Sequence, residues 1–186
     1  MPKTVSLTFI FSMRFLFFFL CTAFVSMSIF GQKTIAKTLR QFNNGSVPYI
    51  TVNELKKNTN YLLLDTRKKE EYRVSHIKNA KWAGYKKFEL DSVLATYPDK
   101  NTPIVVYCSI GVRSENIGEK LQRAGYTNVK NLYGGIFEWK NNKESVVDPS
   151  GHVTEKVHAF NKQWGKLLIH GEKVFTDKFK KLETEH

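Results

Sequence analysis

Short apolar segments alternate with amphipathic ones through the middle of the chain. Residues 61–67 (YLLLDTR) form a continuous apolar run that ends in charged side chains, which is typical of a strand buried on both faces. Residues 103–107 (PIVVY) give the strongest strand prediction in the chain. Further short strands are predicted at the start of YITVNEL and at NAKWAG and NVKNLY, which are residues 49–55, 79–84 and 128–133.

Segments with helical periodicity follow most of these strands. Residues 86–97 and 114–124 place apolar side chains at helical spacing, and Gly125 provides a stop signal after the second segment. Shorter helical pieces are predicted at residues 68–72 and 136–141. This alternation of apolar strands with helices predicts an α/β fold, with a central parallel sheet and helices on both faces.

The segments on either side of this alternation have a different character. Residues 32–47 are polar, lack strong periodicity and are interpreted as a leader into a domain at residues 48–144. The last part, residues 145–186, opens with a linker at 145–151 that contains Pro and Gly. An apolar stripe at helical spacing then predicts that residues 153–183 are mostly helical and pack on the domain.

The first thirty residues are far more apolar than the rest of the chain. Lys3 and Arg14 are their only charged side chains, and residues 15–30 form an apolar run that is short for a membrane-spanning helix, which needs roughly 20 residues. A basic start, a short apolar region and small residues at its end are typical of a secretory signal. We therefore expect residues 1–31 to be a cleaved signal peptide and the mature protein to be exported to the periplasm, with translation starting at Met1 or at Met13.

Two other roles of the N-terminal segment stay open at this point. If the segment is not cleaved, it anchors the chain in a membrane. Cys21 would be a lipid attachment site if a small residue preceded it, but Phe-Phe-Leu stands there instead, which disfavours lipid attachment.

The chain is basic, with 29 Lys+Arg, 17 Asp+Glu and a formal net charge of +12 at pH 7. Residues 1–31 contain two of the basic residues and no acidic one, so the remainder carries a net charge of +10. A basic surface suits nucleic acid, an anionic membrane face or small anionic substrates. Because the lysines are scattered rather than set among aromatics on one periodic face, we predict no specific nucleic-acid binding.

Cys108 is the one cysteine that remains after removal of residues 1–31. Exported domains often pair their cysteines in disulfides, which a lone cysteine cannot do within one chain. Cys108 is therefore either buried and inert or a reactive thiol. One cysteine and scattered histidines do not have metal-ligand spacing, so we expect no metal and no other cofactor.

The loop after the strand at 103–107 contains what a reactive thiol needs. Cys108 stands at the carboxyl end of a strand, where α/β sheets bind their ligands. Gly111 permits backbone angles that other residues resist, so that successive loop N–H groups can turn toward an anion. The next helix begins near Ser114 and adds the positive end of its dipole, while Arg113 adds a full charge. All of these features favour the thiolate form of the cysteine.

Several linked motifs of this chain resemble the rhodanese-like sulfurtransferase domain. CSIGVRS (108–114) resembles the family's Cys-x-x-Gly-x-Arg-Ser/Thr active loop, and LLLDTRKKEEY (62–72) resembles its Leu-Leu-Asp-x-Arg-x-x-x-Glu-Tyr segment. GYTNVKNLYGGIFEW (125–139) resembles the family's Gly-Gly-x-x-x-Trp ending, so the resemblance covers about residues 48–142. SHIKNA (75–80) stands where the family usually has Gly-His-Ile-Pro-Gly-Ala, and its Asn tolerates the left-handed backbone angles of such a turn.

The resemblance implies a thiosulfate sulfurtransferase-like enzyme. The Cys108 thiolate would take a sulfane sulfur from a donor such as thiosulfate, and cyanide, a thiol or a protein sulfur acceptor would then remove it. Asp65 and Arg67, at the end of another strand, are predicted to form an ion pair that supports the site. Substrate binding is assigned to the loop amides and the loop arginine, in residues Ser109, Ile110, Gly111, Val112, Arg113 and Ser114.

Two alternative functions would use the same fold. A related family of cell-cycle phosphatases has a Cys-x5-Arg loop sized for a phosphoryl group, whereas four residues separate Cys108 from Arg113, which favours sulfur over phosphate. A rhodanese-like domain can also be a binding module, or a persulfide carrier that does not turn over small acceptors. Inactive members of the family often lack the active-site cysteine, so the presence of Cys108 argues against an inactive domain. His76 is interpreted as a residue that fixes its loop rather than as a general base.

Overall fold

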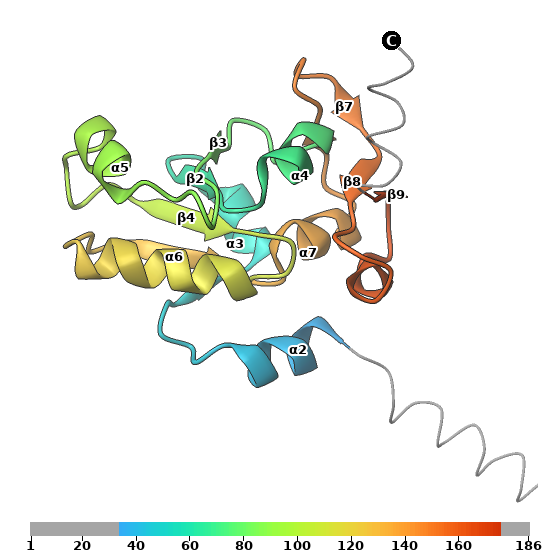
Figure 1. Cartoon of the computed structure of the whole chain (residues 1–186), viewed down its shortest axis with the longest axis horizontal. Helices are drawn as coiled ribbons and strands as arrows, with labels where there is room; N and C mark the ends of the chain where they lie inside the picture. Colours follow the sequence, from blue (N-terminus) through green and yellow to red (C-terminus); the bar gives the residue numbers. More distant parts are fainter. Residues whose placement is uncertain (1–33, 176–186) are drawn as a thin grey trace, which may run out of the picture. The chain divides into compact units, whose positions relative to one another are not determined.

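The computed structural model describes residues 34–175, which form the elements coloured in Figure 1. The predicted signal peptide at residues 1–31, and the part of the C-terminal prediction that follows Phe175, lie outside these residues. Within residues 34–175, no helix is long and apolar enough to cross a membrane. The elements below belong to one compact unit that begins at Ile35.

A five-stranded sheet with the strand order β1-β5-β4-β2-β3 forms the centre of the domain. All of its pairings are parallel, and β4 is hydrogen-bonded to both β2 and β5. The carboxyl ends of the strands therefore meet at one edge of the sheet, with the end of β4 in the middle. The strands match the predicted ones: β1 (Tyr49–Ile50), β2 (Leu62–Asp65), β3 (Lys81–Trp82), β4 (Ile104–Tyr107) and β5 (Val129–Leu132).

Helices connect these strands and cover the sheet (Figure 1). Two of them begin with a capping box, in which a Glu side chain accepts a hydrogen bond from the backbone N–H of the cap residue. The cap N–H groups are those of Thr51, bonded to Glu54 at 2.8 Å, and of Lys68, bonded to Glu71 at 3.0 Å. The helices are α3 (Val52–Lys57), α4 (Lys69–Val74), α5 (Leu90–Thr96), α6 (Val112–Arg123) and α7 (Gly135–Asn141).

Each face of the sheet has its own apolar core, because alternate residues of a strand point to opposite sides. Ile104 of β4 packs with Ile117 of α6 on one face. Val105 and Tyr107 of the same strand pack with Phe137 of α7 on the other face. Full burial of one such side chain stabilises the fold by roughly 1.5–3 kcal/mol. The parallel sheet between two helical layers confirms the predicted α/β fold.

The segment interpreted as a leader contains a helix that the sequence pattern did not predict. Helix α2 (Ile35–Phe42) packs on the domain through Ile35 and Leu39, which are buried in the same core as α7. Apolar residues four positions apart give this helix one buried stripe, but two turns are too short to stand out in a polar segment. Beyond the helix, the Asn43 side chain donates to the Gly111 carbonyl at 3.0 Å. The residues that follow α2 therefore contact the loop after β4.

The prediction that residues 153–183 are mostly helical is wrong for the part that the structure describes. Two residues with positive φ interrupt the segment, Phe160 at +64° and Gly171 at +100°, and neither backbone conformation belongs to a right-handed helix. The observed elements are an antiparallel hairpin, a parallel strand pair and one 3-10 turn: β6 (Val146–Val147), β7 (Val153–Thr154), β8 (Lys156–His158), η1 (Trp164–Leu167) and β9 (Glu172–Val174).

The C-terminal segment nevertheless packs on the domain, as the apolar stripe suggests. Val157 and Leu168 are fully buried in the same core as α7. The predicted linker at residues 145–151 is part of the hairpin, and its Val147 forms a β-bridge with His76. The apolar stripe thus correctly predicted that this segment packs on the domain, but it predicted the wrong secondary structure.

Candidate active site

Cys108 follows β4, the middle strand of the sheet, and is 1% exposed. The chain turns at Gly111, whose φ is +102°, and α6 begins at the next residue. The sequence pattern placed the start of this helix near Ser114. The helix starts earlier because the left-handed glycine serves as its cap, which brings the unpaired N–H groups of the first turn directly against Cys108.

Three backbone N–H groups point at the Cys108 sulfur, and we call this set the sulfur cradle. The Gly111 N–H lies 3.2 Å from Sγ, and the N–H groups of Ile110 and Ser114 also bond to it. Burial by itself raises the pKa of the Cys108 thiol, but the charge of Arg113 and the cradle outweigh burial and hold this pKa below its ordinary value. A lowered pKa increases the fraction of nucleophilic thiolate at neutral pH.

Two neighbouring elements fix the backbone of the cradle. The Asn131 side chain on β5 donates to the Gly111 carbonyl at 2.8 Å and accepts from the Ser114 hydroxyl at 2.8 Å. At the start of α7, the Ile136 N–H donates to the Cys108 carbonyl at 3.0 Å. The loop is therefore held from both sides before any substrate arrives, which is what a preorganised anion site requires.

Gly135 is where α7 approaches the loop most closely. Its φ is +54°, and a Cβ at this position would collide with the carbonyl oxygen of Cys108. In the sequence, this glycine stands out only as part of the Gly-Gly-x-x-x-Trp motif. The structure supplies the physical reason, since a residue without a side chain lets the N–H groups of α7 reach the loop carbonyls.

Arg113 extends from the first turn of α6 and is held by Glu71 of α4. Its guanidinium donates to the Glu71 carboxylate at 2.8 and 2.9 Å and to the Ser109 hydroxyl at 3.0 Å. Burial raises the pKa of a carboxyl group, yet the hydrogen bonds and charge of Arg113 lower the pKa of Glu71 to about 2. This charged, two-point contact fixes the loop to α4.

Sequence reasoning did not single out Glu71 as a site residue. A signal was present, because Glu71 is the Glu of the LLLDTRKKEEY motif and lies at the capping-box position after Lys68. Its contact with Arg113 spans 42 positions in the chain, and no local pattern encodes such a contact.

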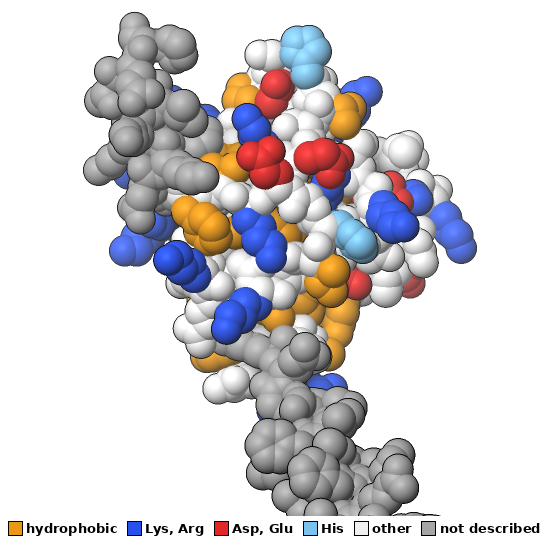
Figure 2. Space-filling model, turned by 90° about the vertical axis from the view of Figure 1, so that its right-hand side faces the viewer, with side chains coloured by type: hydrophobic (Ala, Val, Ile, Leu, Met, Phe, Trp, Pro, Cys, Tyr) orange, Lys and Arg blue, Asp and Glu red, His pale blue; other side chains and the backbone are white. Residues whose placement is uncertain are grey.

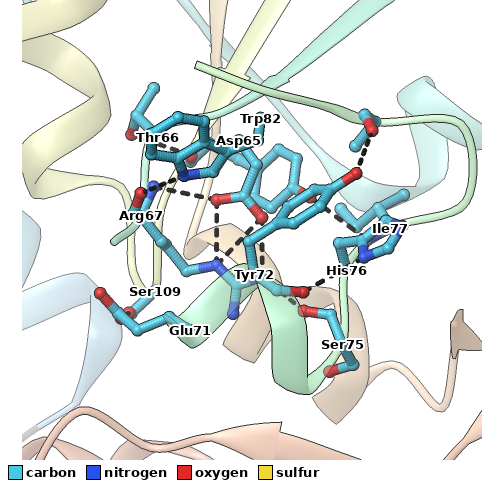
Figure 3. Close-up of polar contacts among 12 residues, drawn as sticks. Asp65, Thr66, Arg67, Glu71, Tyr72, Ser75, His76, Ile77, Trp82 and Ser109 are labelled. Carbon is cyan, nitrogen blue, oxygen red and sulfur yellow. Dashed lines mark hydrogen bonds and ion pairs between the residues drawn. The ribbon is translucent and has the colours of Figure 1, made fainter. Parts of the chain in front are cut away.

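Asp65 and Arg67 form a fully buried ion pair, drawn in Figure 3. Nη2 of Arg67 lies 2.7 Å from Oδ2 of Asp65 and donates to the Ser75 carbonyl at 2.6 Å. Burial lowers the pKa of Arg67, but the Asp65 carboxylate outweighs it and holds that pKa above its ordinary value. The pair ties the end of β2 to the end of α4, the helix that carries Glu71. Its role in supporting the site stays a prediction.

His76 contacts its own loop rather than the cysteine. Its ring stacks on Tyr72 with 4.0 Å between ring centroids, and Nδ1 lies 3.2 Å from the Tyr72 carbonyl oxygen. Both residues appear together in Figure 3. These contacts fit the interpretation of His76 as a residue that fixes the turn after α4. Among residues 34–175, no three His, Cys, Asp or Glu side chains are grouped to hold a metal ion.

A pocket of about 150 Å³ opens onto Cys108. Both segments that flank the predicted domain contribute to it, since Phe42 comes from α2 while Phe160 and Trp164 come from the C-terminal segment. No sequence prediction placed these aromatic residues at the site. The pocket is lined by Phe42, Cys108, Ser109, Ile110, Val112, Arg113, Phe160 and Trp164.

Comparison with known proteins identifies the family. The rhodanese-like domain family matches residues 51–142. A thiosulfate sulfurtransferase GlpE of Coxiella burnetii is 33% identical over 87 residues, which cover 47% of this chain and 78% of that protein. A tRNA uridine(34) hydroxylase of Hamiltonella defensa is 31% identical over 120 residues, or 63% of this chain and 34% of that protein. The chain therefore belongs to the rhodanese-like family.

Solved structures share the fold. The rhodanese-like domain of an Anabaena protein superposes with a TM-score of 0.50 at 23% identity, covering 54% of this chain and 79% of that chain. A thiosulfate sulfurtransferase from Pseudomonas aeruginosa gives 0.51 at 21% identity, over 66% of this chain and 23% of that chain. At these identities the likeness shows the fold alone. Phe42, Phe160 and Trp164 all lie outside the residues that the family matches.

Proposed function

We propose that this protein is a sulfurtransferase in which Cys108 carries a sulfane sulfur from a donor such as thiosulfate to a thiophilic acceptor. The observation that carries the proposal is the sulfur cradle: N–H groups from the loop and the charge of Arg113 converge on one buried cysteine sulfur and lower its pKa. An anionic sulfur is what such a cradle stabilises, whether it is a thiolate or a persulfide.

The proposed reaction has two steps. The Cys108 thiolate attacks the outer sulfur of thiosulfate, the S–S bond of thiosulfate breaks, and sulfite leaves with the bonding electron pair. The enzyme is left as an anionic persulfide. An acceptor such as cyanide then attacks the outer sulfur, leaves as thiocyanate and restores the thiolate. Neither step needs a proton from the enzyme, so the lack of a histidine or carboxylate base among the residues that line the pocket is no obstacle.

Thiosulfate-to-cyanide transfer tests the proposal directly. The wild-type protein is expected to turn over and, after thiosulfate alone, to gain about 32 Da, the mass of one sulfur atom on the cysteine. Cys108→Ser is expected to lose the adduct and nearly all activity, by a factor of about 10³ or more. A folded wild-type protein that shows neither turnover nor adduct would rule the proposal out.

A persulfide carrier is the second candidate, and the burial of Cys108 favours it. Cys108 is 1% exposed and lines the pocket, and such burial would shelter a persulfide from solvent. A carrier would gain the sulfur adduct from thiosulfate yet release it to a protein thiol far faster than to cyanide or a small thiol. Comparable rates of sulfur release to a protein thiol and to small acceptors would favour the sulfurtransferase over the carrier.

The short loop disfavours a phosphatase. Cys108 to Gly111 is all that separates β4 from α6, and Gly111 already caps the helix. This leaves the ring of N–H groups sized for one sulfur atom rather than for a phosphoryl group with its three oxygens. Hydrolysis of a generic aryl phosphate by protein that fails to accept sulfur would reverse this choice.

Small sulfur compounds, rather than nucleic acid, are the proposed partners, with a protein thiol as a further acceptor. On the face shown in Figure 2, Lys and Arg side chains are dispersed, and acidic and hydrophobic side chains lie among them. Nucleic-acid binding proteins usually gather their basic residues in one patch or stripe. Salt-sensitive binding of the protein to a generic duplex or single strand at micromolar concentration would contradict this proposal.

We also propose that the chain is exported. The apolar run at residues 15–30, with Lys3 and Arg14 before it, supports this location. Fractionation of cells that express the full chain is expected to recover it outside the cytoplasm, with a new N-terminus near Gln32. Recovery with the membrane and an intact N-terminus would indicate an anchor instead.

A further inference from the structure

The walls of the pocket do not resemble a site for a small inorganic dianion. Three aromatic side chains, Phe42, Phe160 and Trp164, line it together with Cys108 and its loop, and we call them the apolar wall. We infer that the site selects sulfane-sulfur donors in which an apolar organic group carries the outer sulfur, in preference to thiosulfate. This inference rests on the proposed sulfurtransferase function and deepens it by naming the class of donor.

The charge of the pocket supports this choice. Among the described residues that line it, Arg113 has the only cationic side chain. That charge is already offset, since the guanidinium makes two hydrogen bonds to the buried Glu71 carboxylate and one to Ser109. Thiosulfate brings two negative charges, and one of them would meet apolar side chains without a partner, which is unfavourable. A donor with a single charge at its sulfur end and an apolar remainder matches both halves of the pocket.

Phe160 is held over the site in a costly backbone conformation. Its φ is +64°, a region that bulky side chains rarely adopt. Its N–H donates to Nδ1 of His158 at 3.1 Å, and the Asn161 N–H donates to the Ala159 carbonyl at 2.8 Å, which fixes the turn. The result is a ring 5.2 Å from the centre of the Arg113 guanidinium. Backbone strain that positions one side chain at a site points to a role in that site.

The two flanking segments meet at the mouth of the pocket. The rings of Phe42 and Trp164 lie edge to face with 6.0 Å between centroids. Phe42 is 50% exposed and Phe160 is 39% exposed, so both retain apolar surface that a ligand can cover. Each additional 40–50 Å² of apolar surface removed from water changes affinity by roughly sixfold to tenfold. An aryl group on the donor would be favoured on this scale over a methyl group.

Organic thiosulfonates provide the matched probes. The Cys108 thiolate attacks the outer sulfur of R–SO₂–S⁻, a new S–S bond forms, and the old S–S bond breaks so that the sulfinate R–SO₂⁻ leaves with the electron pair. The enzyme persulfide and the sulfinate together carry the same two negative charges as the reactants. Methanethiosulfonate and benzenethiosulfonate share this head group and charge and differ only in the apolar group that would meet the wall.

The experiment compares kcat/KM for both thiosulfonates and for thiosulfate, with cyanide as the acceptor and with the rate of the uncatalysed reaction subtracted. The wild-type protein is expected to prefer benzenethiosulfonate to methanethiosulfonate by about tenfold or more, and both to thiosulfate. Phe42→Ala, at a half-exposed position, is expected to cut the ratio of the two thiosulfonates at least threefold. Trp164→Ala is expected to cut it further. Ile169→Ala removes an equally apolar but 73% exposed side chain from the same segment, away from the pocket, and should keep the wild-type ratio.

The outcomes separate this inference from the proposed function. A wild-type ratio near one, or a ratio that Phe42→Ala leaves unchanged, would overturn the selection of apolar donors while sulfur transfer stands. Failure of all three donors to load Cys108 would overturn the sulfurtransferase itself. If Trp164→Ala does not fold, Phe42→Ala decides alone.

Discussion

The sulfur cradle and the apolar wall belong to the same pocket, but they are built in different ways. The cradle consists of backbone N–H groups in one short loop, and hydrogen bonds from β5 and α7 hold that loop in place. The wall consists of side chains from two segments that lie outside the family-matched residues 51–142. Backbone N–H groups can stabilise the negative charge of any sulfur anion, whereas the side chains of the wall would contact the rest of the donor molecule. The comparison therefore separates the chemistry of this site from its selection of substrate.

Gly135→Ala is the strongest test of the cradle. The new Cβ would collide with the Cys108 carbonyl oxygen, so α7 must move away from the loop. We expect a loss of about 3 kcal/mol in the free energy of unfolding and of about 100-fold in sulfur transfer, because small displacements of a reactive group are costly. Chemical denaturation and the thiosulfate assay measure the two effects.

Gly151→Ala is the matched control for that variant. Gly151 also has a positive φ, at +85°, but nothing lies within 4 Å of its Cβ position. Strain of the backbone alone is expected to cost about 1 kcal/mol, with full activity. If the two variants had equal activity, the close approach of α7 would not matter to the cradle.

Glu71→Gln tests the ion pair that links the cradle to α4. Because the folded state lowers the pKa of Glu71 from its ordinary value of 4.5 to about 2, the ionised carboxylate stabilises the fold above that ordinary value. This stabilisation, about 3 kcal/mol at neutral pH, is expected to fade as the pH falls from about 5 to about 2. The variant should be less stable at pH 7 and should lack this part of the acid dependence in denaturation curves.

Glu70→Gln serves as the control for the loss of a carboxylate from the same helix turn. Glu70 pairs only loosely with Lys68, at 3.7 Å, and its side chain is 45% exposed. An exposed pair of this kind contributes about 0–1 kcal/mol. An acid dependence of Glu71→Gln that equals that of the wild type would show that the buried pair contributes nothing.

Arg113→Ala tests the side-chain charge that acts on the Cys108 sulfur beside the cradle. Burial raises the pKa of Cys108, and the charge of Arg113 is the largest influence that lowers it, so removal of Arg113 is expected to raise that pKa. The pH dependence of Cys108 alkylation by iodoacetamide measures the midpoint directly. Arg123→Ala, at an exposed position of the same helix, should leave the midpoint where it is. Equal midpoints for both variants would assign the lowered pKa to the N–H groups alone.

The smallest expected effect concerns the backbone strain at Phe160, one of the three residues of the apolar wall. Phe160→Ala keeps the positive φ of +64° on a residue that disfavours it, whereas Phe160→Gly removes that conflict. Since both variants lack the ring, Phe160→Gly is expected to be more stable than Phe160→Ala by about 0.5–1 kcal/mol. Thermal unfolding of the pair measures the difference. Equal stability would mean that the backbone at this position is relaxed.

Much of the site could be predicted because its information is local. Cys108, Gly111 and Arg113 fall within one loop, and the strand before that loop is a continuous apolar run. A short loop at the end of a buried strand has few conformations, so the residue types nearly decide its chemistry. The five strands of the sheet were predictable for a similar reason, since each is a short run with a clear boundary.

The C-terminal segment shows the limit of that approach. Val157 and Leu168 recur at positions compatible with a helix, and the pattern predicted their burial but not their backbone conformation. Phe160 and Gly171 have positive φ values that a right-handed helix does not allow, and the spacing of the apolar residues does not reveal these breaks. Periodicity over a short segment does not distinguish the two outcomes.

The sequence by itself predicted a parallel α/β fold with an activated cysteine directly after one of its strands, and the structure places that strand in the middle of the sheet. Only the tertiary structure decided that Glu71 holds Arg113, that Gly135 lets α7 support the loop, and that Phe42, Phe160 and Trp164 line the pocket. The physical reason is the range of the interactions. Strand hydrophobicity and the cradle come from neighbouring residues, whereas the Glu71–Arg113 ion pair and the apolar wall join segments that become neighbours only after the sheet has formed.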